Sequence, residues 1–233
     1  MTLPLAGGTA VVTGASRGIG RAIALRLAGA GAELALWARD AEDLAVVVGE
    51  IEVRGGRARA QIVDVSDPRA VTEAAAIVRA TMPPVRIVVN NAGSVIRKPT
   101  ATLTDADWRS VMAVNLDGTF YVTRAFLADL TRAGGRIINI SSIAGRQGTP
   151  LLAAYCAAKH GVVGFTRALA EELCAAKVSV NAICPGSVDT AMLREGMPDA
   201  SPDMSPDDIA RTALFLACEA PEALTGTCID VFG

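Results

Sequence analysis

Residues 9–20 read TAVVTGASRGIG. The first five residues are apolar or β-branched and predict a buried strand, and the glycines after them permit a tight turn into a helix that runs to about Gly29. Glycine here lets the backbone approach a pyrophosphate, which would sit against the amino end of that helix. In this strand–turn–helix context we predict dinucleotide binding, with a plain tight turn as the alternative. The residues expected to contact the nucleotide are Gly14, Ser16, Arg17, Gly18, Ile19 and Gly20.

Apolar runs alternate with longer, alanine-rich segments along the rest of the chain. The runs are apolar throughout, as strands are when helices cover both faces of a parallel sheet. We therefore expect an α/β fold, a single Rossmann-type doubly wound parallel sheet of about seven strands with helices on both faces, in one domain over residues 1–233. The expected strands are 9–13, 33–37, 58–63, 85–90, 136–140, 178–184 and 227–231; the expected helices include 41–54, 68–81, 105–132, 154–176 and one starting near residue 206, and 192–205 is expected to be a loop.

Composition narrows the functional classes. The 22 basic and 24 acidic residues give a net charge of -2, so neither nucleic acid nor an anionic membrane is expected as a partner.

The chain starts MTLPLAGG, without a basic segment followed by an apolar run, and we expect no signal peptide and a cytoplasmic location. Arg26 and Glu33 interrupt the apolar stretch 22–38, so no membrane span is expected. Five cysteines without a close pair predict reduced, mostly buried thiols, and no spacing of His, Cys, Asp or Glu predicts a metal site.

The glycine-rich turn also fits the pattern G-x-S-x-G, at residues 14–18. In a serine hydrolase this pattern would place Ser16 as a nucleophile on a strand-to-helix turn. The required base could only be His160, the single histidine, which follows Lys159 within an expected long helix rather than in a late loop. A hydrolase is therefore the least favoured alternative.

The end of the second expected strand bears on cofactor choice. An NAD site places a carboxylate there to bind the adenine ribose, whereas this chain has Ala38 followed by Arg39. Arg39 and Arg17 suit a 2′-phosphate, because planar guanidinium groups pair with its oxygens. Asp40 is a weak counter-argument, since it could cap the helix that follows. We favour NADP(H) over NAD(H).

Further motifs follow in a fixed order. They are Asp64-Val65, Asn90-Asn91-Ala92-Gly93, Asn115, Ser141-Ser142, Tyr155-Cys-Ala-Ala-Lys159 and Pro185-Gly186. Together with residues 13–20, and at these separations, they resemble the classical short-chain dehydrogenase/reductase (SDR) family over nearly the whole chain. Within that family the chain looks most similar to bacterial 3-oxoacyl-thioester reductases.

Tyr155 and Lys159 suit acid–base chemistry. Four residues apart on a helix, they share one face. A tyrosine titrates near pH 10 unaided, and a neighbouring ammonium together with a cationic nicotinamide would lower its pKa. Tyr155 could then protonate an alkoxide formed by hydride attack, or accept a proton in the reverse direction. Ser142, just beyond an expected strand, could donate to the substrate oxygen.

The resemblance implies further roles. It selects Ser142 over Ser141 as the catalytic serine, and it gives Asn115 a local helix distortion and a water-mediated proton relay with Lys159. Lys159 would also bind the nicotinamide ribose. The remaining cofactor contacts implied are Asp64 and Val65 at the adenine, Asn91, Ala92 and Gly93 at the adenosine, and Pro185, Gly186, Val188 and Thr190 at the nicotinamide.

The substrate region departs from the family pattern. Only about fifteen residues separate Thr190 from the helix near Pro206, where a longer lid is common, and this suggests an open or shallow site. Asp199 and Asp203 in this segment are expected to face solvent. Arg132 and Lys177 only loosely represent a basic patch for an acyl-carrier protein. The expected substrate contacts are Ser142, Gln147, Leu152 and Tyr155, with Ser94, Ile96, Leu151 and Met192 as further walls.

The sequence thus predicts an NADP(H)-dependent oxidoreductase that interconverts a carbonyl and a secondary alcohol, a 3-oxoacyl-thioester reductase or another ketoreductase. A non-catalytic NADP-binding sensor or structural protein is the alternative from a different class. By resemblance we also expect a homodimer or homotetramer, built through the helices that hold Asn115 and Tyr155.

Overall fold

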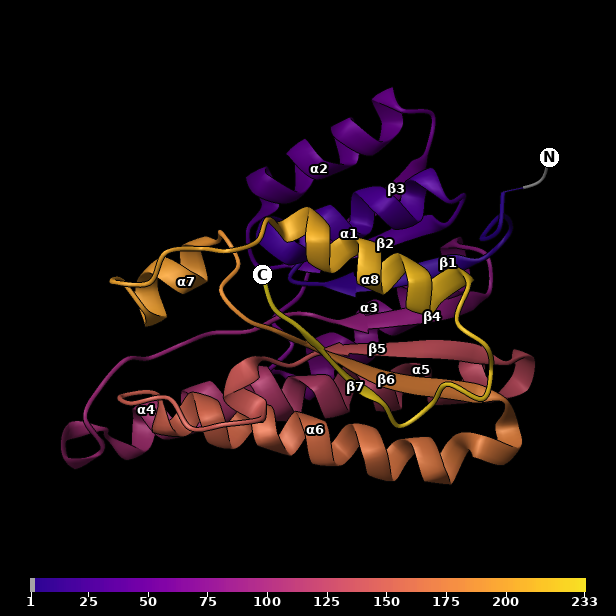
Figure 1. Cartoon of the computed structure of the whole chain (residues 1–233). Coiled ribbons are helices and arrows are strands. Elements are labelled where there is room, and N and C mark those ends of the chain that lie inside the picture. Colours follow the sequence, from indigo (N-terminus) through magenta and orange to yellow (C-terminus); the bar gives the residue numbers. More distant parts are fainter. Residues whose placement is uncertain (1–2) are drawn as a thin grey trace.

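Seven parallel strands form one sheet in the order β3-β2-β1-β4-β5-β6-β7 (Figure 1). The computed structural model describes residues 3–233. Met1 and Thr2 lie outside the described residues; they begin the N-terminal segment in which no signal peptide is expected. The strand order reverses direction between β1 and β4, and this confirms the doubly wound fold predicted from the sequence. The strands are β1 Thr9–Thr13, β2 Glu33–Ala38, β3 Arg57–Ile62, β4 Val85–Asn90, β5 Gly135–Ile140, β6 Val178–Pro185 and β7 Cys228–Val231.

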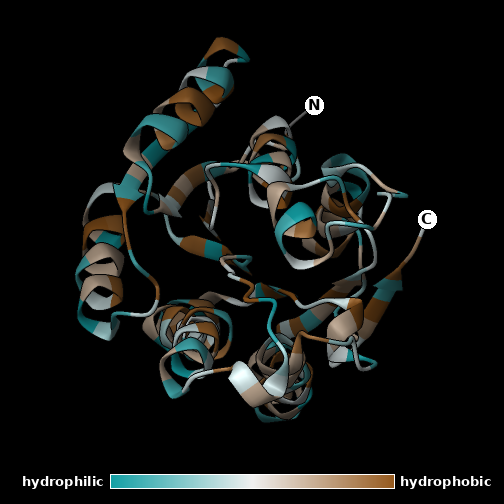
Figure 2. Ribbon diagram, turned by 90° about the vertical axis from the view of Figure 1, so that its left-hand side faces the viewer, coloured by the Kyte–Doolittle hydropathy of each residue, from teal (hydrophilic) through white to brown (hydrophobic). Residues whose placement is uncertain are grey.

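Helices cover both faces of this sheet (Figure 2). Ala10 and Val12 of β1 face a core shared with α1, α2 and α8, while Val11, between them, faces a second core shared with α3, α5 and α6. Successive side chains of a strand point to opposite faces, so a strand covered on both sides must be apolar at every position. The helices are α1 Gly18–Gly29, α2 Ala41–Val53, α3 Pro68–Thr81, α4 Asp105–Met112, α5 Gly118–Ala133, α6 Ala153–Leu173, α7 Ala191–Gly196 and α8 Pro206–Cys218.

Three details differ from the sequence prediction. The strand β3 is not apolar, and much of it is exposed, because it lies at the sheet edge with a neighbour on one side only. The helix expected over 105–132 is interrupted by a π-helical turn, Ala113–Asp117, between α4 and α5. The expected loop 192–205 begins with α7, whose first turn is capped by the Thr190 hydroxyl.

The cysteines are free, as expected, but they are not mostly buried. Only Cys184 on β6 is buried; Cys174 is exposed and the other three are partly exposed. The reason is their placement: Cys228 lies on the edge strand β7, while Cys156 and Cys218 lie on helices. Among residues 3–233, no helix is long and apolar enough to cross a membrane.

The turn between β1 and α1 is packed against the segment after β4. Gly14 and Gly18 have φ values of +61° and +55°, a region that glycine enters at no steric cost. Asn91 Nδ2 donates to the carbonyl oxygens of Thr13 and Gly14, at 2.9 and 3.1 Å. A Cβ atom on Gly20 would overlap Gly14 O and Asn91 Nδ2. The turn therefore needs glycine at position 20 for packing between helix and strand.

We expect Gly20→Ala to lower the free energy of unfolding by about 3 kcal/mol, because the methyl group would meet backbone that cannot move aside. Gly29→Ala is the matched control at the other end of α1. A Cβ there meets nothing within 4 Å, so stability should stay unchanged or rise by up to about 1 kcal/mol. Urea unfolding of both variants measures this; equal costs at the two positions would contradict the packing argument.

Candidate active site

A cleft of about 1690 Å³ lies at the carboxyl ends of the strands. This is the edge where doubly wound sheets bind ligands. The cleft brings together nearly all the residues singled out in the sequence, from segments far apart in the chain. Those lining it are Gly14, Ser16, Arg17, Gly18, Ile19, Arg39, Asp64, Val65, Asn91, Ala92, Gly93, Ser142, Gln147, Leu152, Tyr155, Lys159, Pro185, Gly186, Val188 and Thr190. Gly20 and Asn115 lie behind this lining; of the further walls expected, Ser94 and Met192 line the cleft and Ile96 and Leu151 do not.

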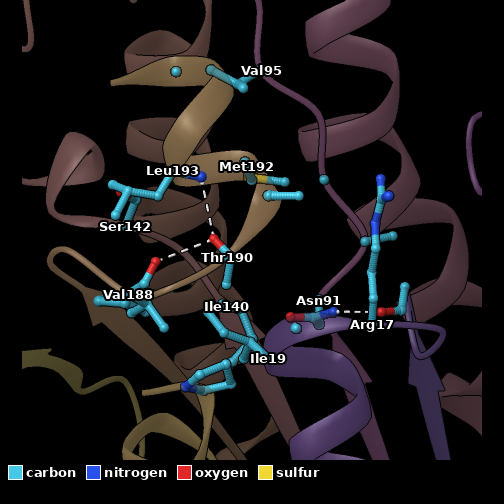
Figure 3. A pocket seen from close by; sticks show the side chains of 18 of the residues that line it. Arg17, Ile19, Asn91, Val95, Ile140, Ser142, Val188, Thr190, Met192 and Leu193 are labelled. Carbon is cyan, nitrogen blue, oxygen red and sulfur yellow. Dashed lines mark hydrogen bonds between the residues drawn. The ribbon is translucent and has the colours of Figure 1, made fainter. Parts of the chain in front are cut away.

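The amino end of α1 fits an anionic ligand. Its N-cap residue, Arg17, makes no side-chain cap, whereas Asp40, Asp67 and Thr104 cap the first turns of α2, α3 and α4. The first N–H groups of α1 are thus left for a ligand in the cleft. Together with the glycine turn, this fits the pyrophosphate of a dinucleotide. Figure 3 shows Arg17 reaching along the cleft opposite Thr190.

Arg39 lies where the adenine ribose of a dinucleotide would be expected. Its positive charge acts on Asp64, the next expected contact. Burial would raise the pKa of Asp64, but hydrogen bonds from the Ser66 hydroxyl and backbone N–H, with the charge of Arg39, lower it overall. Asp40 accepts from Asp43 N at 3.0 Å as the cap of α2, the role that was the alternative to nucleotide binding.

Tyr155 and Lys159 both point inward from α6 and are buried. Burial raises the pKa of Tyr155 to about 12, an effect that a hydrogen bond with Ser142 partly offsets. The predicted lowering of this pKa requires the ammonium together with a bound cationic nicotinamide, so it stays a prediction for the complex with the cofactor. Lys159 Nζ lies 5.6 Å from the centre of the tyrosine ring and donates to the carbonyl oxygen of Ile140 at 2.9 Å. Burial also lowers the pKa of Lys159 from 10.5 to about 8.

Asn115 occupies the π-helical turn between α4 and α5, so the helix distortion implied by the family resemblance is present. Its side chain is fully buried, and Nδ2 donates to the carbonyl oxygens of Ser94 and Val111, both at 2.8 Å. The extra residue of a π turn frees backbone groups from the regular helix pattern. Asn115 thereby ties the helix to the segment after β4, and its part in a proton relay stays a prediction.

The short segment after β6 covers part of the cleft. Val188 and Met204 pair across the base of this segment, and the side chain of Thr190 bonds Leu193 N at 3.2 Å (Figure 3). The Met192 sulfur lies 3.9 Å from the phenol oxygen of Tyr155. The residue Tyr155 is only 9% exposed. The segment thus covers Tyr155, so the site is not shallow at this point. Asp199 is exposed and does not line the cleft, as expected, whereas Asp203 is exposed but borders the cleft.

Sequence reasoning missed α7 as an element. A helix-capping threonine, Thr190, precedes it and could have indicated it. Sequence reasoning also gave Ser141 no part in the site, whereas Ser141 borders the cleft and its hydroxyl bonds the backbone carbonyl oxygen of Lys159. The bond of Ser141 does not stand out in a linear motif, because its partner lies 18 residues away.

The hydrolase alternative lacks its base. His160 is exposed on α6, its Nδ1 pairs with the carbonyl oxygen of Cys156, and it does not line the cleft that holds Ser16. Within residues 3–233, no group of three or more His, Cys, Asp or Glu side chains could hold a metal ion.

The pKa of Lys159 predicts a pH-dependent stability. Below about pH 8 folded and unfolded chains both carry the proton, and the folded protein bears the full cost of the buried ammonium. From about pH 8 to 10.5 the unfolded chain holds more protons, so stability increases with pH. Relative to Lys159→Met, the wild type should thus be least stable below pH 8 and gain as the pH approaches 10.5. Urea unfolding of both proteins at about pH 7 and about pH 10 measures this; a pH-independent difference would contradict it.

Curated relatives align with nearly the whole chain. A family model for short chain dehydrogenases matches residues 8–200. The putative ketoacyl reductase of the monensin polyketide synthase from Streptomyces virginiae is 38% identical, over 96% of this chain and 95% of its own. The 3-oxoacyl-[acyl-carrier-protein] reductase of Pseudomonas aeruginosa is 35% identical, over 99% of this chain and 98% of its own.

Solved structures agree with these relatives. A putative NAD(P) dependent gluconate 5-dehydrogenase from Beutenbergia cavernae with bound NADP has a TM-score of 0.91 at 38% identity, covering 99% of this chain and 97% of its own. A single-residue variant of actinorhodin polyketide ketoreductase with NADPH has a TM-score of 0.91 at 35% identity, covering 97% of this chain and 96% of its own. Carveol dehydrogenase from Mycobacterium avium in complex with NAD has a TM-score of 0.93 at 29% identity, covering 99% of this chain and 98% of its own.

Family model, relatives and structures thus span most of the sequence and share one architecture. The chain belongs to the short-chain dehydrogenase family and is an NAD(P)-dependent oxidoreductase that acts on a small molecule.

Proposed function

We propose that this oxidoreductase is an NADP(H)-dependent ketoreductase in which Tyr155 is the general acid and base. The observation that carries the proposal is the meeting of Ser142, Tyr155 and Lys159 in the same cleft as the uncapped amino end of α1. When bound, the nicotinamide supplies the hydride for reduction or accepts it in oxidation. One domain would hold both the cofactor and the reacting groups, since both line one cleft at one sheet edge.

The chain's own residues handle the substrate oxygen. The Ser142 hydroxyl donates to the carbonyl oxygen, which polarises the C=O bond. The phenol of Tyr155 gives its proton to that oxygen as negative charge develops, and takes it back in the reverse reaction. Burial alone opposes the phenolate that this transfer leaves, so positive charge is needed beside it. Lys159 would provide part of that charge and would bind the ribose hydroxyls, with Asn115 in the relay that returns the proton.

Two arginines support NADP(H) as the cofactor. Arg17 and Arg39 both line the cleft, Ala38 stands where an NAD-binding carboxylate would be sought, and Asp40 is engaged as a helix cap. The 2′-phosphate of NADP(H) would pair with the two guanidinium groups. NADP or NADPH is bound in two similar structures, and NAD in a third.

The substrate that we propose is a ketone carried on an apolar chain, with a 3-oxoacyl thioester as the leading class. Val95, Leu152 and Met192 pack around Tyr155 in one apolar cluster, which suits an alkyl chain beside the carbonyl. Two relatives are named as reductases of ketoacyl or 3-oxoacyl groups. Arg132 and Lys177 border a separate hollow at the amino ends of β5 and β6, so they do not support carrier docking at the cleft.

We also propose assembly into a homodimer or homotetramer through α5 and α6. Phe120 on α5 is 41% exposed, lies edge-on to Phe165 of α6 and carries the Arg124 guanidinium 4.7 Å from its ring centre. Exposed small residues, Gly164 and Ala168, on α6 would permit close helix packing. A cytoplasmic location stays a prediction from the sequence.

Tyr155→Phe tests the reaction. The variant should bind NADPH as the wild type does and lose most turnover, at least about 100-fold in kcat, because the proton donor is gone while the ring remains. Steady-state reduction of a panel of ketones and 3-oxoacyl thioesters, with fluorescence titration of NADPH, measures both. Retained turnover would contradict the assigned role of Tyr155. Wild-type cofactor binding without turnover of any substrate would instead favour a non-catalytic sensor.

Arg39→Asp tests the cofactor assignment. A carboxylate would repel the 2′-phosphate and could accept from the ribose 2′-hydroxyl, so preference should shift toward NAD(H) by about tenfold or more. Thermal-shift and fluorescence titrations with NADPH and NADH side by side measure the shift. Arg69→Asp, which makes the same charge change at an exposed position of α3 outside the cleft lining, is the control. Unchanged preference in Arg39→Asp would remove Arg39 from the proposed phosphate site.

A further inference from the structure

Four successive residues at the end of β5 and just beyond it each contact helix α6. Asn139 Nδ2 donates to Thr166 Oγ1 at 2.9 Å, and the carbonyl oxygen of Ile140 accepts from Lys159 Nζ at 2.9 Å. Ser141 Oγ donates to the backbone carbonyl oxygen of Lys159 at 3.0 Å. The Ser142 hydroxyl acts on Tyr155 of α6, the pKa of which it lowers. We call these contacts of residues 139–142 with α6 the β5–α6 seam.

Lys159 is held twice by this seam. The Ser141 hydroxyl donates to the backbone carbonyl oxygen of Lys159. The Lys159 ammonium donates in turn to the carbonyl oxygen of Ile140, the residue before Ser141. Carbonyls inside a helix already accept an N–H four residues on. The bond from Ser141 is therefore an addition to the helix pattern, and its effect is to fix where α6 lies against β5 at this one residue.

The bond between Ser141 and Lys159 is closed to other groups. Both residues are buried. Gly145 packs directly over the pair, and a Cβ on it would stand 2.5 Å from Ser141 Oγ and 2.6 Å from the Lys159 carbonyl oxygen. No side chain fits above the bond, so a lost hydroxyl could not be replaced by a neighbouring one.

We propose that Ser141 is a positioning residue for the reaction: its hydroxyl fixes the backbone of Lys159 and so sets how far the ammonium reaches beneath Tyr155. The inference rests on the proposed function, in which Lys159 supplies charge beside Tyr155. Ser141 borders the cleft, but it is only 3% exposed and its hydroxyl is committed to the Lys159 carbonyl oxygen. It would therefore act through Lys159 and not by touching the substrate.

Thr166 provides the matched control on the same seam. It lies two helical turns beyond Lys159, and its hydroxyl joins α6 to Asn139, which in turn accepts from Asn90 on β4. Thr166→Val removes one buried hydroxyl from the β5–α6 seam, as Ser141→Ala does, but leaves both contacts of Lys159 in place. If Ser141 had a purely structural role, the two variants would both lose stability and would show the same kcat and the same pH profile.

The experiment compares stability, NADPH affinity and the pH profile of kcat for alcohol oxidation in the wild type, Ser141→Ala and Thr166→Val. Both variants should lose stability. Only Ser141→Ala should also lose about tenfold in kcat with unchanged NADPH affinity, and should move the rising limb of its pH profile to higher pH, because the phenolate of Tyr155 is then less well stabilised. The other ionisable groups that act on this pair, Cys156 beside Tyr155 and Cys184 beside Lys159, are the same in all three proteins.

An unshifted profile and unchanged kcat in Ser141→Ala would overturn the inference while leaving the proposed function standing. A failure of the proposed function itself would show earlier, as turnover retained by Tyr155→Phe. Should Ser141→Ala not fold, Ser141→Cys keeps a side chain of similar size but offers a weaker donor, and the same shift in profile is expected, smaller in size. A Ser141→Cys profile identical to that of the wild type would then overturn the inference.

Discussion

The packing of α6 against the carboxyl end of β5 is the contact on which the candidate site depends. Tyr155 and Lys159 lie on the helix, Ser142 follows the strand, and hydrogen bonds from Asn139 and Ser141 join the two elements. Polar groups in a core are costly unless they are paired, and pairing makes their arrangement specific. Here the polar contacts hold a helix at one position along a strand, and apolar packing by itself would permit small shifts.

Burial sets the chemistry that this position allows. The cleft around Tyr155 raises the pKa of the phenol and lowers that of the Lys159 ammonium, so the folded protein keeps the tyrosine protonated and binds the lysine proton weakly. A buried acid that holds its proton until charge appears nearby is suited to protonating an alkoxide. The same desolvation makes the protonated Lys159 a cost to stability, and shifted pKa values of this kind are a common property of reacting groups in enzymes.

The two halves of the cleft are held by different means. At the nucleotide side, close packing of Gly20 on Gly14, with Asn91 as a hydrogen-bond donor, leaves the amino end of α1 uncapped and open. At the substrate side, α7 rests on side chains: Met192 lies against Tyr155, and Gly196 against Val95. Backbone packing fixes the first half tightly. The second half depends on a flexible thioether, which can adapt to different ligand shapes.

Local rules explain what the sequence by itself determined. Strands covered on both faces must be apolar throughout, a glycine turn before a helix has few other uses, and residues four apart on a helix share a face. These rules sufficed for the doubly wound class of the sheet, for the turn at 13–20 and for the pairing of Tyr155 with Lys159. Only the tertiary structure decided the exposure of β3, the cover that α7 gives the cleft and the rise in the pKa of Tyr155. Each of these depends on which distant segments surround a residue, and so on burial and contacts that no local pattern encodes.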